Sequence, residues 1–290
     1  MPYIYLVLAT FFLSFSSISA SFYNRKNEGK RDITPLYNLL QLSAVFILWL
    51  FKFILNPEFD LAVLPYSALF ALGYTAAMMS IVSVYREGPI MLSSLIMQLS
   101  MISTTVWGFF FWNSPVTPVV ISGLVLVVLS LWLCLYTGKG KEQGKKFSVK
   151  WLCFIAVYFV GNSVCSITQR TQQLDFNSSY GDFLMATATA VGFIVCLLLY
   201  LRSDKSDSKE ILKKTGYFPF ISGALNFALN LIIIILASTS LSPSLIYPVL
   251  AVGSLAITTV FSVFIFKEKM FWWQWIGVSL GAVAIALLSI

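Results

Sequence analysis

The chain has 290 residues, of which 58% are hydrophobic and only 11% charged, and its net charge is +7. Soluble domains typically carry about 25% charged residues, so this composition excludes an ordinary soluble fold and predicts an integral membrane protein. The positive charge does not indicate a nucleic-acid partner, because Lys and Arg lie in short segments between apolar stretches and not in one basic arm.

Ten apolar stretches are long enough to cross a bilayer as helices, which takes about 20 residues each. They are about twice too long for the strands of a membrane barrel and lack the alternation of such strands. The first is interpreted as a helix and not as a cleaved signal peptide, because no Lys or Arg precedes it. In chain order the predicted helices are Tyr3–Phe22, Pro35–Leu55, Ala62–Tyr85, Pro89–Trp112, Val116–Tyr136, Val149–Gln169, Ser179–Leu201, Thr215–Ser238, Pro243–Phe266 and Phe271–Ile290.

Prolines and polar segments mark the joints between these helices. Pro35, Pro89 and Pro243 each open a helix, where the missing amide proton costs nothing. A basic segment rich in Gly and Lys, 138–148, separates a first half, 1–137, from a second half, 149–290. No polar segment exceeds roughly a dozen residues, so we expect no separate soluble domain.

The two halves repeat each other. Residues 65 to 133 align with residues 219 to 287 at one constant offset of 154, which places Pro65 on Pro219, Pro89 on Pro243, Thr104-Thr105-Val106 on Thr258-Thr259-Val260, Phe110 on Phe264 and Gly123 on Gly277. Five helices per half is an odd number, so the second half must enter the membrane from the opposite side to the first. The predicted fold is therefore an all-α integral membrane protein of ten transmembrane helices, arranged as two inverted five-helix repeats.

Local motifs add a resemblance to a known family. Pro243 opens the ninth helix, Glu268 follows it directly, and Gln274-Trp275-Ile276-Gly277 leads into the last helix. With its length, helix count and repeat, the chain resembles the ten-helix EamA-like form of the drug/metabolite transporter superfamily. The resemblance implies transport of a small metabolite but does not fix which one. One departure is Asn113-Ser114-Pro115, where the second half has Lys267-Glu268-Lys269.

Uncharged polar side chains in mid-helix predict where a substrate would bind, because in hydrocarbon such groups need a partner or a wet cavity. Asn226 and Asn230 lie one turn apart and share a face, as do Asn162, Ser166 and Gln169, and Pro248 interrupts the helix beside Tyr247. The alternative, that such residues only join helices, stays open, and it is favoured for the serines of the first helix. The candidate substrate-binding residues are Tyr74, Gln98, Asn162, Ser166, Asn226, Asn230 and Tyr247.

Charged residues are absent from the centres of the predicted helices. Proton relays usually need an intramembrane carboxylate, so we expect a facilitator or exchanger of neutral or zwitterionic solutes. Lys52, Arg170 and Asp182 lie near helix ends and are expected to be solvated. We predict no cofactor and no metal site, because the chain has no His and its four cysteines form no CxxC motif. An enzyme is disfavoured, because no nucleophile motif or aspartate-rich motif is present.

The predicted function is therefore secondary transport of small neutral or zwitterionic metabolites, similar to amino acids or sugars, by alternating access between the two repeats. A lipid-carrier flippase and a non-transporting membrane subunit of the same fold are the alternatives. The expected partners are a small-molecule substrate and the lipid bilayer, and association into a homodimer is left open.

The distribution of Lys and Arg predicts the orientation. Loops after helices one, three, five, seven and nine are rich in both residues, whereas the other loops carry only Lys52 and Arg170. Short basic loops stay in the cytoplasm. The sequence thus predicts a multi-pass protein of the plasma membrane, in a bacterium the inner membrane, with both termini outside.

Overall fold

The computed structural model describes residues 2–31, 33–87, 90–114, 116–135, 148–266 and 271–288. The described segments are helical and contain no strand. In chain order the helices are α1 (Pro2–Lys26), α2 (Ile33–Leu55), the single 3-10 turn η1 (Leu61–Val63), α3 (Leu64–Glu87), α4 (Ile90–Phe111), α5 (Pro118–Leu135), α6 (Val149–Asp175), α7 (Gly181–Arg202), α8 (Ser208–Thr215), α9 (Tyr217–Ala237), α10 (Pro243–Phe266) and α11 (Trp272–Leu288).

The long helices coincide with the predicted stretches, but several ends differ. Helix α1 continues past Phe22 to Lys26, and α6 continues past Gln169 to Asp175. No Gly or Pro interrupts either extension, so the backbone keeps its helical hydrogen bonds after the apolar run has ended. The short helix α8 forms where the sequence had indicated only a loop. Its Ile211 is fully buried against the bundle, which holds this amphipathic turn in place.

Seven helices of the described chain are long and apolar enough to cross a membrane: α1, α2, α3 with its preceding turn, α6, α7, α9 and α10. The described residues also give two shorter apolar segments, Ile102–Phe111 in α4 and Pro118–Ser130 in α5. Large apolar side chains such as Phe51, Leu72 and Phe110 point outward and are more than half exposed. Such a surface suits lipid and not water, so the protein is an all-helical protein of the multi-pass membrane type.

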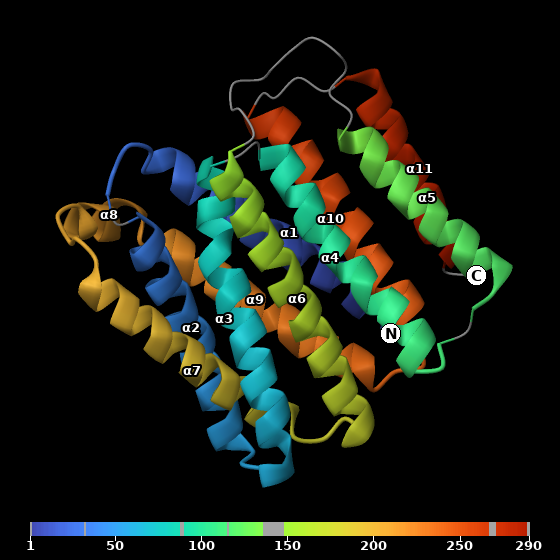
Figure 1. Ribbon diagram of the computed structural model, residues 1–290, viewed down its shortest axis with the longest axis horizontal. Coiled ribbons are helices and arrows are strands. Elements are labelled where there is room, and N and C mark those ends of the chain that lie inside the picture. Colours follow the sequence, from blue (N-terminus) through green and yellow to red (C-terminus); the bar gives the residue numbers. More distant parts are fainter. Residues whose placement is uncertain are drawn as a thin grey trace.

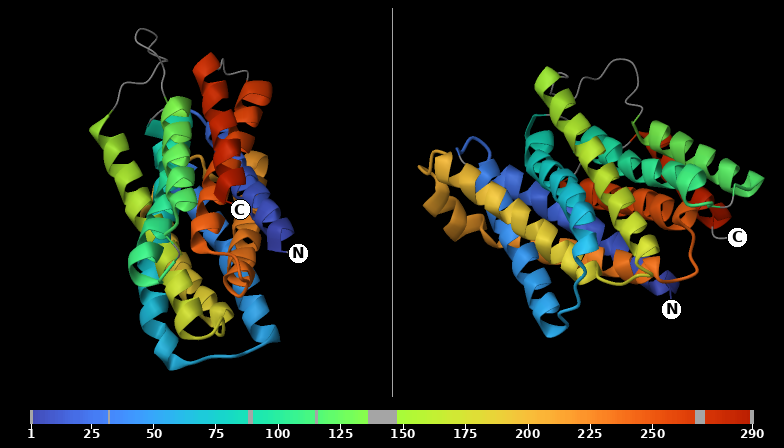
Figure 2. Two further views of the ribbon diagram at one scale, coloured as in Figure 1. Left: turned by 90° about the vertical axis from the view of Figure 1, so that its right-hand side faces the viewer. Right: turned by 60° about the horizontal axis from the view of Figure 1, so that its bottom comes forward.

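The helices form a two-layered bundle. Helices α2 and α7 lie at one edge and α5 and α11 at the other (Figure 1). Between these edges α3 packs on α6, α1 packs on α9, and α4 packs on α10. Figure 2 shows the layers edge-on, with α3, α4 and α6 in one and α1, α9 and α10 in the other.

Small residues bring the central helices close together. A Cβ atom on Gly161 of α6 would lie 2.6 Å from the carbonyl oxygen of Gly73 in α3, so only glycine fits at this crossing. Between α1 and α9, Ser16 shares a 2.8 Å hydrogen bond with Ser222, and Ser19 donates to the carbonyl oxygen of Phe218. These two serines join helices, as the sequence had favoured.

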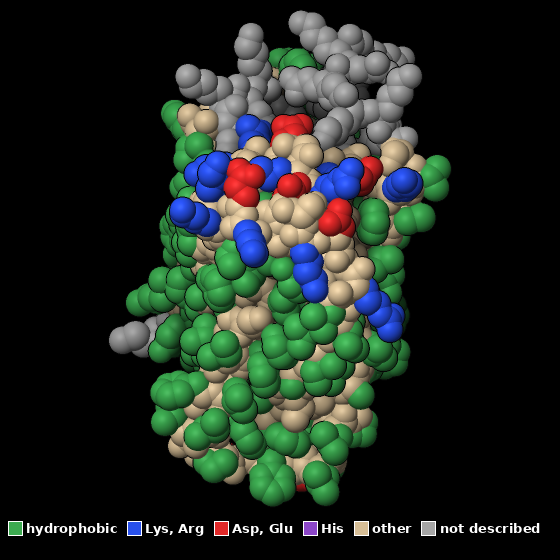
Figure 3. Space-filling model, turned by 90° about the vertical axis from the view of Figure 1, so that its left-hand side faces the viewer, with side chains coloured by type: hydrophobic (Ala, Val, Ile, Leu, Met, Phe, Trp, Pro, Cys, Tyr) green, Lys and Arg blue, Asp and Glu red, His purple; other side chains and the backbone are tan. Residues whose placement is uncertain are grey.

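Charged side chains gather at one end of the bundle (Figure 3). This end carries α8 and the segment between α1 and α2, where Lys30 pairs with Glu210 at 2.8 Å and Arg31 with Asp204 at 3.3 Å. We call it the basic end. The termini of the chain lie toward the opposite end (Figure 1).

Three charged residues that were expected to be solvated instead have partners within the protein. Lys52 of α2 pairs with Asp182 of α7, whose side chain is only 17% exposed. Nη1 of Arg170 donates a 2.7 Å hydrogen bond to the carbonyl oxygen of Ala237, at the end of α9. The expectation failed because helix ends that face each other shield these groups from water, which the spacing along one helix does not reveal.

Candidate functional site

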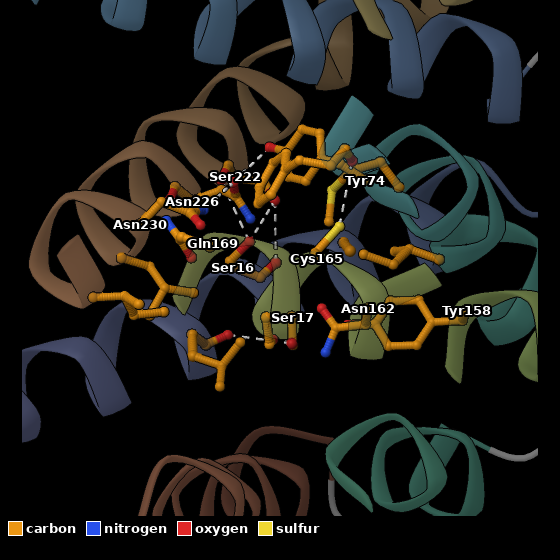
Figure 4. Close-up of a pocket in the computed structure, with 18 of the residues that line it drawn as sticks. Ser16, Ser17, Tyr74, Tyr158, Asn162, Cys165, Gln169, Ser222, Asn226 and Asn230 are labelled. Carbon is orange, nitrogen blue, oxygen red and sulfur yellow. Dashed lines mark hydrogen bonds between the residues drawn. The ribbon is translucent and has the colours of Figure 1, made fainter. Parts of the chain in front are cut away.

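A cavity of about 60 Å³ lies between α1, α2, α3, α6 and α9, near the middle of most of these helices (Figure 4). All five helices contribute polar side chains to its lining, and the described lining residues include no charged side chain. The polar residues of the lining, apart from three further tyrosines, are Ser16, Ser17, Tyr74, Asn162, Ser166, Gln169, Ser222, Asn226 and Asn230.

Helical spacing brings these side chains together. On α9 the positions 222, 226, 230 and 233 succeed one another by three or four residues, which places them on one face. Positions 162, 166 and 169 do the same on α6, and positions 13, 17 and 20 on α1. The cavity is therefore the place where these separate faces converge.

A hydrogen-bonded group spans the cavity between α3 and α9. The hydroxyl of Tyr74 donates to Oδ1 of Asn226 over 2.6 Å. Nδ2 of Asn230 donates to the same Oδ1 over 3.0 Å and to the backbone oxygen of Asn226 over 2.9 Å. Because both partners donate to Oδ1 of Asn226, the amide nitrogen of Asn226 remains available as a donor.

The two carboxamides of α6 that line the cavity, Asn162 and Gln169, also contact side chains of neighbouring helices. Nδ2 of Asn162 donates to Oγ of Ser100 on α4 over 2.8 Å. Nε2 of Gln169 lies 3.8 Å from the sulfur of Met185 on α7, a weak acceptor. In each amide the oxygen atom and the second hydrogen of the nitrogen have no partner among the described residues.

The remaining lining is apolar or aromatic. Phe70 stacks on Tyr74 with ring centroids 5.4 Å apart, and Met78, Tyr85 and Tyr158 continue this surface. The lining therefore offers hydrogen-bonding groups and ring contacts to a ligand. Within the described part of the chain, no three His, Cys, Asp or Glu residues are placed to hold a metal ion.

Apolar clusters lie toward both ends of the bundle. One includes Tyr23, Ile33 and Ile211, near the basic end, and the other includes Leu6 and Leu236, near the opposite end. A volume of about 60 Å³ holds a few water molecules, whereas pockets for metabolites measure roughly 300 to 1,000 Å³. In this structure the cavity is therefore too small for a ligand of metabolite size unless the helices move apart.

Five of the seven predicted site residues line this cavity: Tyr74, Asn162, Ser166, Asn226 and Asn230. Tyr247 does not. It is buried in α10 within a cluster that includes Leu229 and Leu236, and α10 contributes no residue to the described lining of the cavity. Gln98 belongs to α4, and its side chain lies outside the described part of the structure.

Several lining residues were missed or were assigned only to helix contacts. Ser222 lies one turn before Asn226, so extending that polar face by a turn would have found it. Ser16 does join helices, but it lines the cavity as well. Tyr37, Tyr85 and Tyr158 gave no signal, because tyrosines are frequent in this chain and are common at membrane interfaces.

No protein-family model matches the chain. No curated protein matches it either. Among solved structures, one described only as "Crystal structure of protein" is similar with a TM-score of 0.67. It is 11% identical, and the match covers 97% of this chain and 94% of that chain. At this identity the likeness concerns the fold alone, and it extends over nearly the whole helical bundle.

Proposed function

We propose that the protein is a ten-helix secondary transporter, similar to the EamA-like members of the drug/metabolite transporter superfamily. It moves small neutral or zwitterionic metabolites across the plasma membrane by alternating access between two inverted five-helix repeats. The observation that carries the proposal is the central cavity, which both halves of the chain line with uncharged polar groups.

The helix contacts support the inverted repeat. If α1 to α5 correspond in order to α6, α7, α9, α10 and α11, the packing of α1 on α9 and α10 has its counterpart in the packing of α6 on α3 and α4. Likewise the contact of α2 with α9 corresponds to that of α7 with α3. Ser14 donates to the backbone oxygen of Ser254, and Ser163 donates to that of Ser100, the equivalent position at the offset of 154.

The cavity lining obeys the same correspondence. Positions 13, 16, 17 and 20 of α1 and positions 162, 165, 166 and 169 of α6 differ by a constant 149 (162 − 13 = 149). Positions 70, 74, 78 and 81 of α3 and positions 222, 226, 230 and 233 of α9 differ by 152 (226 − 74 = 152). The offset of 154 therefore aligns α4 with α10, whereas α3 aligns with α9 at an offset of 152. The alignment of the two halves thus needs a two-residue gap between these two pairs of helices.

The chemistry of the lining supports an uncharged or zwitterionic solute. A net charge in this cavity loses its hydration and finds no oppositely charged side chain among the described lining residues. No carboxylate lines the cavity within the described chain, so transport follows the substrate gradient without proton coupling.

Counterflow in proteoliposomes tests this function. Vesicles containing the purified protein are preloaded in turn with unlabelled amino acids, sugars or nucleosides, and uptake of the labelled compound is measured with and without a pH gradient. We expect one class to exchange at a rate that the pH gradient does not change. Asn226→Leu with Asn230→Leu should abolish this flux, whereas Thr258→Val, which lies outside the cavity lining, should preserve it. The absence of exchange for every class, with folded protein in the vesicles, contradicts the proposal.

A lipid-carrier flippase remains a second candidate because of one further feature. An apolar groove of about 460 Å³ lies on the outer surface of α4 and α6, lined by Ile102, Ser103, Val106, Trp107, Phe110 and Phe159. A flippase also needs a free basic group for a phosphate. Lys52 is paired with Asp182, and Arg170 binds a backbone oxygen, so we favour the soluble substrate. Scrambling of a fluorescent phospholipid in the same vesicles separates the two, and we expect none.

A further inference from the structure

The central cavity lies between the two layers of the bundle. Helices α3 and α6 line it from one layer, and α1 and α9 line it from the other (Figure 2). Opening the cavity toward one end of the bundle therefore requires that the layers move apart at that end. Contacts that join the layers there oppose this movement. The argument that follows rests on the alternating access of the proposed function.

Arg170 forms such a contact at the end of the bundle opposite the basic end, which we call the far end. Its Nη1 donates a 2.7 Å hydrogen bond to the carbonyl oxygen of Ala237, the last residue of α9. The last carbonyl oxygens of a helix have no partner within the helix and carry partial negative charge, so a guanidinium is a favourable partner for them. The bond joins α6 of one layer to α9 of the other.

This hydrogen bond lies directly beyond the cavity lining on both helices. On α6 the lining positions end at Gln169, the residue before Arg170. On α9 they end at Ile233, and Ala237 follows about one helical turn later. Moving α6 away from α9 at the far end of the cavity therefore breaks the bond.

A second contact joins the layers at the edge of the bundle. Lys52 in the last turn of α2 pairs with Asp182 in the first turn of α7, which places the pair at the far end. Helix α2 packs on α9 and α7 packs on α3, so the pair connects helices that are attached to different layers. The side chains are only 34% and 17% exposed, so water screens their attraction less than that of a surface pair.

We infer that Arg170 and the Lys52–Asp182 pair form a latch, which holds the two layers together at the far end and must break before the cavity opens to that side. The guanidinium of Arg170 also has a buried donor, Nε, without a partner among the described residues. Water that enters on opening can bind the donors of Arg170, so the protein exchanges one hydrogen bond for several. The latch thus opposes opening without preventing it.

The native Cys165 can report the opening. It lines the cavity five residues before Arg170 on α6, and it is only 6% exposed. A charged thiol reagent therefore reaches it only after the cavity has opened to the side from which the reagent is added. The reporter protein keeps Cys165 and carries Ala in place of Cys134, Cys153 and Cys196.

The measurement is the rate at which a membrane-impermeant methanethiosulfonate with a trimethylammonium group modifies Cys165, in intact cells and in inside-out vesicles. Glu58→Cys at the far end and Ser206→Cys at the basic end, each as the single thiol of the protein, show which preparation exposes which end. The comparison of the two ends is therefore independent of the orientation of the protein in the membrane.

Removing either part of the latch should expose Cys165 to the far end. Arg170→Met should raise the far-end rate by about tenfold or more, because hydrogen bonds to charged groups are the stronger ones. Lys52→Met combined with Asp182→Asn should raise it by about threefold or more, because a partly exposed ion pair contributes less. Neither change should raise the rate from the basic end.

Two control variants separate the latch from a general loosening of the bundle. Tyr66→Phe removes a far-end hydrogen bond to Asp175, but this bond joins α3 to α6 within one layer. Glu210→Gln removes an ion pair with Lys30 at the basic end. Both variants should leave the far-end rate within about twofold of that of the reporter protein.

The inference is overturned if a folded latch variant reacts no faster from the far end, or if it reacts faster from both ends to the same degree. Acceleration by Tyr66→Phe as large as that by Arg170→Met would overturn it as well. The variant with both Lys52→Met and Asp182→Asn leaves no unpaired charge, so the test can be decided even if Arg170→Met does not fold.

The outcome is distinguishable from that of the proposed function, because modification of Cys165 needs no transported solute. Faster modification in the latch variants, with no flux of any solute in proteoliposomes, would keep the latch and reject transport. Flux in proteoliposomes, with an unchanged modification rate in the latch variants, would keep transport and reject the latch.

Discussion

The hydroxyl of Tyr74 donates a 2.6 Å hydrogen bond to Oδ1 of Asn226 and so joins α3 to α9 directly across the central cavity. Both side chains are buried, with 3% and 7% of their surface exposed. A buried hydroxyl without a partner costs about 1 to 3 kcal/mol, more than the net gain from making the bond. The bond therefore constrains how each residue can be replaced.

We predict strong coupling between these two residues. Asn226→Leu should destabilise the protein by about 1 to 3 kcal/mol, because it leaves the Tyr74 hydroxyl unpaired, and Tyr74→Phe by about 1 kcal/mol. The double variant should lose less than the sum of the two. Reversible unfolding in mixed detergent micelles measures all three. Additive losses would mean that the bond does not persist in the folded protein.

Replacing Gly161 tests the crossing of α3 and α6. The new Cβ of Gly161→Ala would meet the backbone oxygen of Gly73 at 2.6 Å, and a backbone atom cannot rotate away. We expect a loss of about 1 to 3 kcal/mol, as for other overpacked sites. Gly108→Ala is the control, since its nearest contact is the Ser114 hydroxyl, which can move. Equal losses in the two variants would argue against the close crossing.

Much of the cavity could be predicted from the sequence, and the reason is helical periodicity. Residues four apart share one face of a helix, as Asn226 and Asn230 do on α9 and Asn162 and Ser166 on α6. These residues meet at the cavity because both faces point into the bundle. Periodicity does not say which faces meet. Tyr247 was grouped with them because of Pro248, but this tyrosine packs into an apolar cluster, and α10 contributes no residue to the described lining of the cavity.

Contacts between the ends of different helices could not be predicted from the sequence. The pairing of Lys52 with Asp182 depends on the packing of α2 against α7, two helices that are far apart in the chain. The same holds for α8, whose eight residues are too few to form a stable isolated helix. It becomes helical because Ile211 is buried against the bundle.

The Lys52–Asp182 pair should stabilise the end of the bundle opposite the basic end. Removing one partner leaves a largely shielded charge, so Lys52→Met should cost about 1 to 3 kcal/mol, between the values for exposed and buried pairs. Lys52→Met combined with Asp182→Asn leaves no unpaired charge and should recover most of this loss. Unfolding midpoints of the single and double variants provide the comparison. A double variant less stable than Lys52→Met would show that Asp182 makes favourable interactions other than its pair with Lys52, and would contradict this account.

At the basic end, acid should weaken the attachment of α8. A hydrogen bond from Lys30, with further help from Lys214, lowers the pKa of Glu210 from 4.5 to about 2. Because the folded-state pKa is the lower one, this stabilisation is complete above pH 4.5 and disappears as the pH falls toward about 2. The difference in thermal unfolding midpoint between the unchanged protein and Glu210→Gln should become smaller as the pH falls over that range. High salt should reduce the difference at neutral pH, since these groups are exposed. A difference that does not depend on pH would contradict this account.

The orientation prediction follows from the grouping of Lys and Arg at one end of the bundle (Figure 3). Ser206 is exposed at the basic end, whereas Glu58 and Thr117 are exposed in the segments that follow α2 and α4, at the opposite end. Basic segments of this length are retained in the cytoplasm, so the basic end should face inward and both termini outward.

Cysteine labelling in whole cells tests this orientation. The background variant carries Ala or Ser in place of Cys134, Cys153, Cys165 and Cys196, so that only the introduced thiol reacts. Glu58→Cys and Thr117→Cys should react with a membrane-impermeant maleimide in intact cells, and Ser206→Cys only after the membrane is permeabilised. Reaction of Ser206→Cys alone in intact cells would invert the assignment. Equal reaction of all three would mean that the chain inserts in both orientations, since a sealed membrane protects any site on its inner side.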